Sequence, residues 1–198
     1  MMPLRASLTG AAIVAFISFP AARGQTTGDD YLRQSLSGGF LYEMKLGQNF
    51  YFPTHVPGYS VNYSYRPLRW LALEAGFEQF PRPLGSSVCC EYLTNANDQL
   101  YLVPFGARYV WESQQWRVRM SVGGGGAYLN HAIGHEDFGS NLVSATGWGG
   151  QVVASGDYGM TRSGRLRAGL TGRYYYLSLF GNTERFLTIG PQITFSFR

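Results

Sequence analysis

The stretch Arg-Leu-Arg-Ala-Gly-Leu-Thr-Gly-Arg-Tyr-Tyr-Tyr-Leu, residues 165–177, sorts most of its side chains into two sets by position. The even-numbered positions include the apolar side chains of Leu166, Ala168, Leu170, Tyr174 and Tyr176. The odd-numbered positions include the polar side chains of Arg165, Arg167, Thr171 and Arg173. Successive side chains of a β-strand point to opposite faces of a sheet, so this alternation predicts a strand with one apolar and one charged face.

Seven further stretches of the chain alternate in the same way. They are residues 36–46, 59–66, 70–80, 100–111, 116–129, 146–158 and 185–197. Between the end residues of all eight runs, every charged side chain falls on the face opposite the apolar one. A membrane β-barrel needs this arrangement, because an Arg or Lys facing lipid at the bilayer midplane costs roughly 2–4 kcal/mol. Composition alone would also be compatible with a soluble β-sandwich.

The lengths of the connections between these runs give an independent criterion. Three connections are long, at residues 47–58, 81–98 and 130–145, and three are short, at residues 67–69, 112–115 and 159–164; residues 178–184 are intermediate. Outer-membrane barrels alternate long extracellular loops with short periplasmic turns. The chain is therefore predicted to be all-β, an eight-stranded antiparallel up-and-down transmembrane β-barrel with both termini on the periplasmic side.

The amino terminus has the profile of a secretory signal peptide. A basic start is followed by an apolar stretch through residue 20, and small residues stand at the −3 and −1 positions of a cleavage site before Gln25. We therefore expect a signal peptide at residues 1–24, a short periplasmic segment at residues 25–35 and the barrel at residues 36–198. Cleavage would remove Arg5 and Arg23, which leaves 14 of the 16 Lys and Arg residues against 12 acidic ones. This near-neutral balance gives no reason to expect a nucleic-acid partner.

Composition agrees with a barrel and excludes a helical membrane protein. Glycine accounts for 26 of 198 residues, and Tyr and Phe together for 27. Beyond the signal peptide, no segment approaches the 18 or more consecutive apolar residues that a membrane helix needs. Aromatic residues near the two ends of the runs are expected to form two girdles around the barrel. The lower girdle comprises Tyr65, Tyr109, Trp111, Trp116 and Tyr158, and the upper girdle Phe77, Tyr101, Tyr128, Trp148 and Tyr176.

Two local features add a resemblance to a known family. The run Gly123-Gly-Gly-Gly-Ala-Tyr128 and the terminal stretch Thr194-Phe-Ser-Phe197 resemble strands of the small outer-membrane β-barrel proteins, which include the OmpA transmembrane domain, OmpX and OmpW. Members usually end on an aromatic residue that the barrel-assembly machinery reads, whereas here Arg198 follows Phe197. The resemblance implies location in the cell outer membrane, with lipid or lipopolysaccharide and the assembly machinery as partners. The resemblance leaves open whether the loops bind an extracellular ligand.

For function, the resemblance implies a structural or surface-interaction role. The alternative is a small channel or transporter for small apolar or anionic solutes, as in OmpW-like proteins. A lipid A-modifying enzyme is less favoured, because that pattern needs a Ser two residues from a His. The positions two after His55, His131 and His135 are Pro57, Ile133 and Asp137. We therefore expect no enzyme.

The histidines also fail to suggest a metal site. We expect His131 and His135 in a Gly-containing loop with Glu136 and Asp137, where a four-residue spacing does not align ligands. Solvated loop polarity explains them better, so neither a metal nor another cofactor is expected.

Cys89 and Cys90 are adjacent in the second long loop. A disulfide between them would be strained, because adjacent Cα atoms lie about 3.8 Å apart and disulfides prefer about 4.4–6.8 Å. A strained vicinal disulfide and a pair of unbridged or intermolecular thiols both remain open.

The charged faces converge on the inside of the expected barrel. An eight-stranded barrel is only just wide enough for side chains to fill it, and unpaired charges there are costly. We therefore predict an ionic network in the lumen, formed by Glu43, Glu74, Arg108, Arg117, Arg119, Asp157 and Arg167. The alternative is a partly hydrated lumen in which excess Arg makes a narrow anion-preferring path.

Overall fold

A computed structural model describes residues 31–46, 55–83, 96–113, 115–135, 140–179 and 182–198 of the 198-residue chain. These residues form eight β-strands. They are β1 (Gln34–Lys45), β2 (His55–Leu68), β3 (Leu71–Pro83), β4 (Ala96–Ser113), β5 (Val118–His135), β6 (Ser140–Gly159), β7 (Leu166–Leu179) and β8 (Asn182–Phe197).

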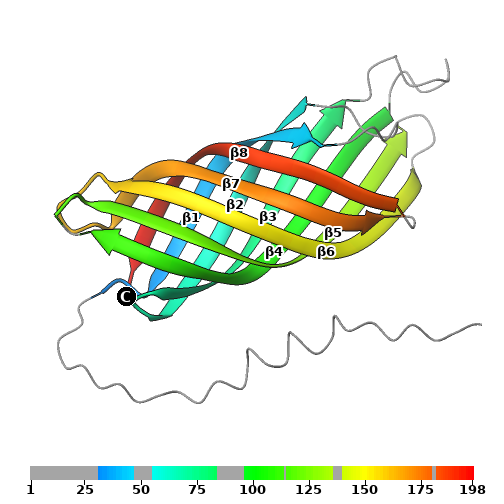
Figure 1. Ribbon diagram of the computed structural model, residues 1–198. Coiled ribbons are helices and arrows are strands. Elements are labelled where there is room, and N and C mark those ends of the chain that lie inside the picture. The colour runs from blue at the N-terminus through cyan, green and yellow to red at the C-terminus, as the bar shows by residue number, and fades with distance from the viewer. Residues whose placement is uncertain (1–30, 47–54, 84–95, 114, 136–139, 180–181) are drawn as a thin grey trace, which may run out of the picture. The chain divides into compact units, whose positions relative to one another are not determined.

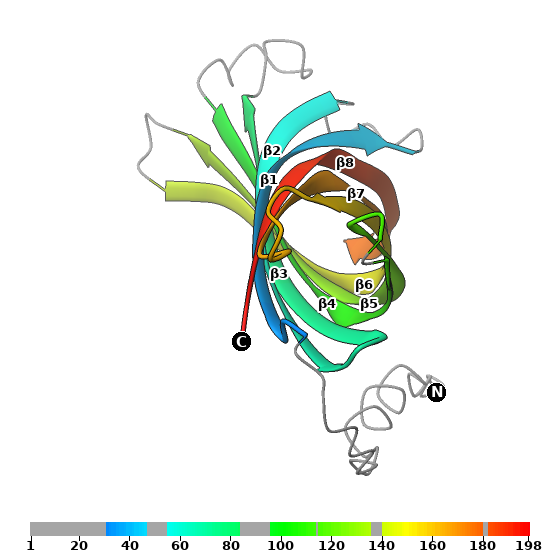
Figure 2. The same cartoon turned by 90° about the vertical axis from the view of Figure 1, so that its left-hand side faces the viewer.

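The strands close into one barrel in chain order. Each strand pairs antiparallel with the next, and β1 pairs antiparallel with β8, for example Leu36 opposite Phe195. Figure 1 shows the barrel from the side, and Figure 2 shows the ring of strands from one end. The predicted fold, an eight-stranded antiparallel up-and-down barrel, is confirmed. Within the described residues, no helix has the length and apolar character to cross a membrane.

The two ends of the barrel differ in their connections. One end, here called the turn end, carries the connections at residues 69–70, 114–117 and 160–165 together with the C terminus. At the other, the loop end, β1 is followed by β2, β3 by β4, β5 by β6 and β7 by β8. Gln34 Nε2 donates a hydrogen bond to the carbonyl oxygen of Arg198 at 3.4 Å, so the first and last strands begin and finish at the turn end.

The strands extend further towards the loop end than the alternation predicted. Strand β6 has 20 residues, whereas a tilted strand needs only about 9–11 to cross the hydrocarbon core. Backbone pairing of β5 with β6 continues to His135 opposite Ser140. The assignment of the histidines to loops was therefore wrong: His131 and His135 lie within β5, and His55 is the first residue of β2. Apolar alternation marks only the part of a strand that would face lipid, whereas hydrogen bonding between strands continues beyond it.

The outer surface is apolar and carries the predicted aromatic girdles. Trp111, Trp116 and Tyr158 near the turn end are 51%, 68% and 56% exposed. Nearer the loop end, the rings of Tyr128 and Trp148 lie 4.8 Å apart between centroids. The outward orientation of these side chains confirms the assignment of the apolar face.

Candidate functional site in the barrel interior

The interior of the barrel is divided into two layers of opposite character. The half towards the turn end contains ion pairs and amides, and we call it the charged layer. The half towards the loop end contains a buried apolar cluster, which we call the apolar layer. Its members are Leu41, Val56, Phe80, Leu100, Leu102, Ala127, Leu129, Tyr175, Leu177 and Phe186.

The centre of the charged layer is built around Arg173 on β7. Its guanidinium lies 3.3 Å from a carboxylate oxygen of Glu74 and 3.1 Å from one of Glu78, both on β3. It also donates hydrogen bonds to Asn62 Oδ1 at 2.9 Å and Gln151 Oε1 at 3.0 Å. Arg173 is 1% exposed. One cation thus joins side chains from β2, β3, β6 and β7 across the lumen.

Glu74 also pairs with a second arginine. Arg108 on β4 forms an ion pair with the same carboxylate and donates to Ser155 Oγ at 3.3 Å. The Glu74 side chain is 3% exposed. It is therefore the anion shared by two buried cations, and we expect its charge to be essential for the balance of the layer.

A second group of ion pairs lies nearer the turn end. The carboxylate of Glu112 pairs with Arg66 at 3.0 Å and with Arg167. Arg119 pairs with Asp157 at 2.9 Å, and Gln192 Nε2 donates to the other oxygen of Asp157 at 2.7 Å. These contacts connect β2 with β4 and β7, and β5 with β6 and β8.

Some glycines make room for these side chains. A Cβ on Gly169 would collide with the Asp157 carboxylate and the backbone of Gly156. A Cβ on Gly76 would collide with the amide of Asn62. The glycine-rich composition is thus partly explained by the volume of the polar groups in the lumen.

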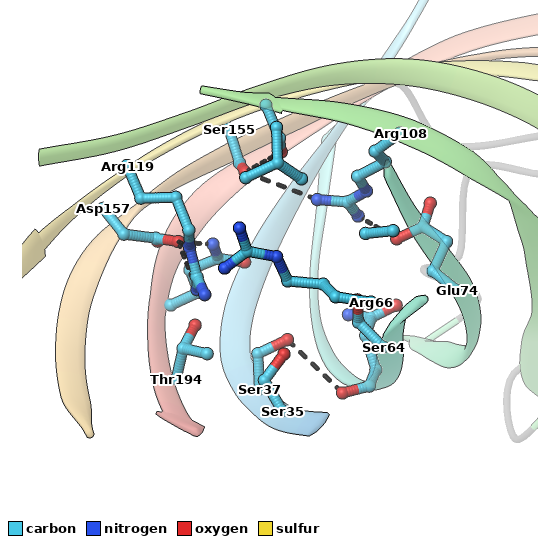
Figure 3. A pocket seen from close by; sticks show the side chains of 15 residues that line it. Ser35, Ser37, Ser64, Arg66, Glu74, Arg108, Arg119, Ser155, Asp157 and Thr194 are labelled. Carbon is cyan, nitrogen blue, oxygen red and sulfur yellow. Dashed lines mark hydrogen bonds and ion pairs between the residues drawn. The ribbon is translucent and has the colours of Figure 1, made fainter. Parts of the chain in front are cut away.

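A small cavity remains within the charged layer. Its volume is about 40 Å³, which admits only a few water molecules. Figure 3 shows its wall, with Arg119 beside Asp157, Arg108 beside Glu74, and Arg66 extending into the space between them. The cavity is too small for a continuous aqueous path.

The apolar layer closes the lumen beyond the charged layer. Phe80, Leu102, Tyr175 and Leu177 are all fully buried. The rings of Tyr175 and Phe186 lie 5.0 Å apart between centroids. Closer to the loop end, Lys45 lies 3.7 Å from the carboxylate of Glu184. An ion moving through the barrel would have to displace tightly packed apolar side chains between two charged regions.

The structure brings together most of the predicted lumen residues, but not all of them. Glu74 contacts Arg108, Arg119 contacts Asp157, and Arg167 lies in the second group of ion pairs. Glu43 is also buried in the interior, on β1.

Arg117 was assigned to the lumen incorrectly. It is exposed in the connection at residues 114–117, with a φ of 52°, and β5 begins one residue later. The alternation was extended into a turn, where the two-residue period no longer applies.

Four charged residues of the network were not in the predicted set: Arg66, Glu78, Glu112 and Arg173. Three of them lie on the inward parity of their runs, and that signal alone would have identified them. Glu112 was placed in a short turn, whereas β4 continues to Ser113 and directs its carboxylate towards two arginines. The cysteine pair lies outside the described residues.

The described interior is electrically balanced. Its cations are Arg66, Arg108, Arg119, Arg167, Arg173 and Lys45, and its anions are Glu43, Glu74, Glu78, Glu112, Asp157 and Glu184, six of each sign. Each of the five arginines forms an ion pair. Within the described residues, no group of three or more His, Cys, Asp and Glu side chains could hold a metal ion. This chemistry favours cross-linking of strands over selection of a permeating anion.

Comparison with known proteins shows the fold. The structure of Neisserial surface protein A matches with a TM-score of 0.63 and 15% identity, covering 83% of this chain and 97% of that chain. Ail, the attachment invasion locus protein of Yersinia pestis, matches with a TM-score of 0.53 and 16% identity, covering 83% and 99%. The N-terminal β-barrel domain of Pseudomonas aeruginosa OprF matches with a TM-score of 0.53 and 13% identity, covering 83% and 98%. No family model and no curated protein matches by sequence. The chain therefore shares the eight-stranded barrel fold of small outer-membrane proteins.

Proposed function

We propose that this chain is an outer-membrane β-barrel protein with a non-conducting interior and a structural or surface-interaction role. The filled lumen is the observation that carries this proposal. Each of the five described arginines of its charged layer is paired with a carboxylate, and its apolar layer is packed so that residues such as Phe80 and Leu102 have no exposed surface. The apolar band on the outside supports insertion into a bilayer.

A conducting lumen would require features that the described interior does not provide. Ion pathways need a hydrated route whose binding sites are weak enough for ions to leave. Here the arginine side chains are held by carboxylates, and the cavity between them has a volume of about 40 Å³. An apolar constriction without room for water also blocks ions by itself. The channel alternative is therefore less well supported than a closed barrel.

The surface-interaction role rests on the loop end. Strands β4, β5 and β6 have 18, 18 and 20 residues, more than a bilayer crossing needs, so the strands themselves would extend beyond the membrane surface at the loop end. Ail, which shares the fold, has been crystallised with the heparin analogue sucrose octasulfate. A comparable use of the loop end for an external ligand is part of the proposal. The proposal assigns no catalytic residue.

Planar-bilayer recording of the refolded protein tests the closed interior. We expect no steady conductance for the wild-type chain. The mobility shift between unheated and heated samples on a gel verifies separately that the barrel has folded and inserted. As a matched comparison, two residues of the apolar layer, Leu102 and Leu129, are replaced by Ala to open a path. A wild-type protein that conducts anions at the level of this double variant would contradict the proposal and favour the small-channel alternative.

A further inference from the structure

An apolar groove runs along the outside of the barrel over β4 to β8. Its volume is about 470 Å³, within the range of roughly 300–1,000 Å³ that is common for small-molecule sites. Exposed side chains form its rims, with Trp111 and Met120 among them on one side and Leu170 and Ile189 on the other. The lining is overwhelmingly apolar, so the groove is suited to a hydrocarbon chain.

The floor of the groove is formed by residues that have little or no side chain. Gly156 lies on β6, and Gly172 on β7 is paired with Ala154. A Cβ on Gly156 would meet no atom within 4 Å, and one on Gly172 would meet only the Thr188 carbonyl oxygen at 3.8 Å. These glycines are therefore not required by packing inside the barrel, in contrast to Gly169, where a Cβ would collide with Asp157. Their small size leaves the groove open.

Positive charge is concentrated at the turn end of this groove. Arg117 follows Trp116 in the connection that leads into β5, and Arg162 and Arg165 lie in the neighbouring connection from β6 to β7. All three are exposed, and the described residues offer no carboxylate paired with them. Gly159 at the end of β6 is next to Arg117: its backbone N–H donates to the Arg117 carbonyl oxygen at 2.8 Å. The arginines thus lie just beyond the turn end of β5, β6 and β7, the strands that form the groove floor and part of its rims.

We propose that the groove and these arginines together bind an anionic phospholipid, with one acyl chain in the groove and the phosphate at the arginines. The proposal rests on the membrane insertion proposed above and adds a defined lipid site to it. The aromatic side chains of Trp111 and Trp116 mark the level at which hydrocarbon gives way to headgroups. Guanidinium groups at this level match phosphate in charge and in hydrogen-bonding geometry.

Charge favours a lipid over a second copy of the chain as the occupant. Two barrels inserted in the same direction and joined through this face by a two-fold axis would bring the same residues together. The arginine clusters of both copies would then lie at the same depth and repel each other. An anionic headgroup neutralises the cluster instead.

The test measures which lipid contacts the groove. A single-tryptophan variant retains Trp111 and carries Trp70→Phe, Trp116→Phe and Trp148→Phe; its matched control retains Trp148 near the loop end and replaces the other three. Each full-length chain is refolded into vesicles of phosphatidylcholine mixed with phosphatidylglycerol, one of the two being brominated on an acyl chain. Quenching of tryptophan fluorescence gives the ratio of the association constants of the two lipids.

We expect Trp111 to report a preference for phosphatidylglycerol and Trp148 to report none. Each arginine that contacts the phosphate should contribute roughly fivefold, the factor that corresponds to about 1 kcal/mol. Arg117→Gln should reduce the preference at Trp111 by about that factor, whereas Arg185→Gln near the loop end should leave it unchanged. Gly156→Leu should decrease quenching of Trp111 by both lipids, because the leucine fills the groove without entering the barrel. Gly172→Leu provides a second variant of this kind.

Equal association of the two lipids at Trp111, or the same preference at Trp148, would overturn the site. Loss of quenching at Trp111 together with cross-linked dimers would show that a second copy occupies the groove. Failure of the chain to form a heat-modifiable barrel in any vesicle would refute membrane insertion, and the lipid site with it. A folded barrel without lipid preference would refute the site alone.

Discussion

Replacement of Glu74 by Gln removes the carboxylate shared by Arg108 and Arg173. Arg173 keeps its ion pair with Glu78 at 3.1 Å, whereas Arg108 keeps only the 3.3 Å hydrogen bond to Ser155. The side chains of Arg108 and Glu74 are 11% and 3% exposed, so water compensates little of the lost charge. Breaking one side of a buried ion pair costs about 3–5 kcal/mol. We expect Glu74→Gln to lower the free energy of unfolding by about 3 kcal/mol, mainly through Arg108.

Urea unfolding of the refolded protein, followed by the gel-mobility shift of the folded barrel, measures this change. Glu112→Gln is the matched control, since Glu112 also holds two arginines but its side chain is 26% exposed. The control should lose less than Glu74→Gln, because Glu112 is partly open to water and its two arginines still donate to the backbone carbonyl oxygens of Arg69 and Gly164. The double variant Glu74→Gln with Arg108→Met should regain stability, because it removes the unpaired cation together with its partner.

Equal losses for Glu74→Gln and Glu112→Gln, or a loss below about 1 kcal/mol for Glu74→Gln, would refute the argument that burial of Glu74 determines the cost. Bilayer recordings of Glu74→Gln add a second criterion. We expect them to remain silent, because the apolar layer lies beyond the charged layer and is unaffected by the substitution.

Two further predictions concern the orientation of side chains, and a third concerns the expected orientation of the barrel. Phe80→Ala, at a site with 0% exposure inside the barrel, should cost about 3–5 kcal/mol in urea unfolding, and a similar loss for Phe40→Ala, at a site 77% exposed on the outside, would contradict the two-layer interior. Val122→Arg on the outer face should reduce insertion into vesicles by roughly 2 kcal/mol relative to the apolar control Val122→Leu; equal insertion of the two variants would mean that the faces are misassigned. The cysteines at residues 89–90 should react with a membrane-impermeant maleimide on intact cells, and a need for permeabilisation would reverse the orientation.

The sequence predicted the strands because an outer face suited to lipid follows a simple rule. Every outward residue within the hydrocarbon core must be apolar, so a two-residue period is visible at positions such as Leu170, Val122 and Ile193. The strand ends were less accurate, since no such rule applies beyond the membrane surface. Backbone pairing alone carries β5 to His135 and β6 back to Ser140. The turn at Arg117 was misread for the same reason.

The interior was harder to predict because the contacts of inward residues depend on the arrangement of all the strands. No fixed pattern in the sequence reports those contacts. The prediction named an ionic network in the lumen but no apolar layer, whereas Leu102, Leu129 and Leu177 are buried inside the barrel and belong to one. Alternation identifies which residues point inward, but not which of them meet across the barrel. The pairing of Glu74 with Arg108 joins neighbouring strands, whereas that of Arg66 with Glu112 joins β2 to β4 across an intervening strand. Such pairs depend on the register and tilt of all eight strands together.

The distribution of charge at the two ends of the barrel bears on how it is oriented in a membrane. The turn-end connections at residues 69–70, 114–117 and 160–165 contain four arginines and no acidic residue. The loop-end connections at residues 46–54, 84–95, 136–139 and 180–181 contain three acidic residues and no Lys or Arg. A barrel that inserts from the periplasm must carry one set of connections across the hydrocarbon core. Carboxylates can cross in the protonated form, whereas arginine stays charged at any accessible pH, so the arginine-bearing turns should remain on the side from which insertion starts. For the proposed outer-membrane barrel, this asymmetry favours a periplasmic turn end independently of the connection lengths, and the arginines of the proposed lipid site would then lie at the inner leaflet.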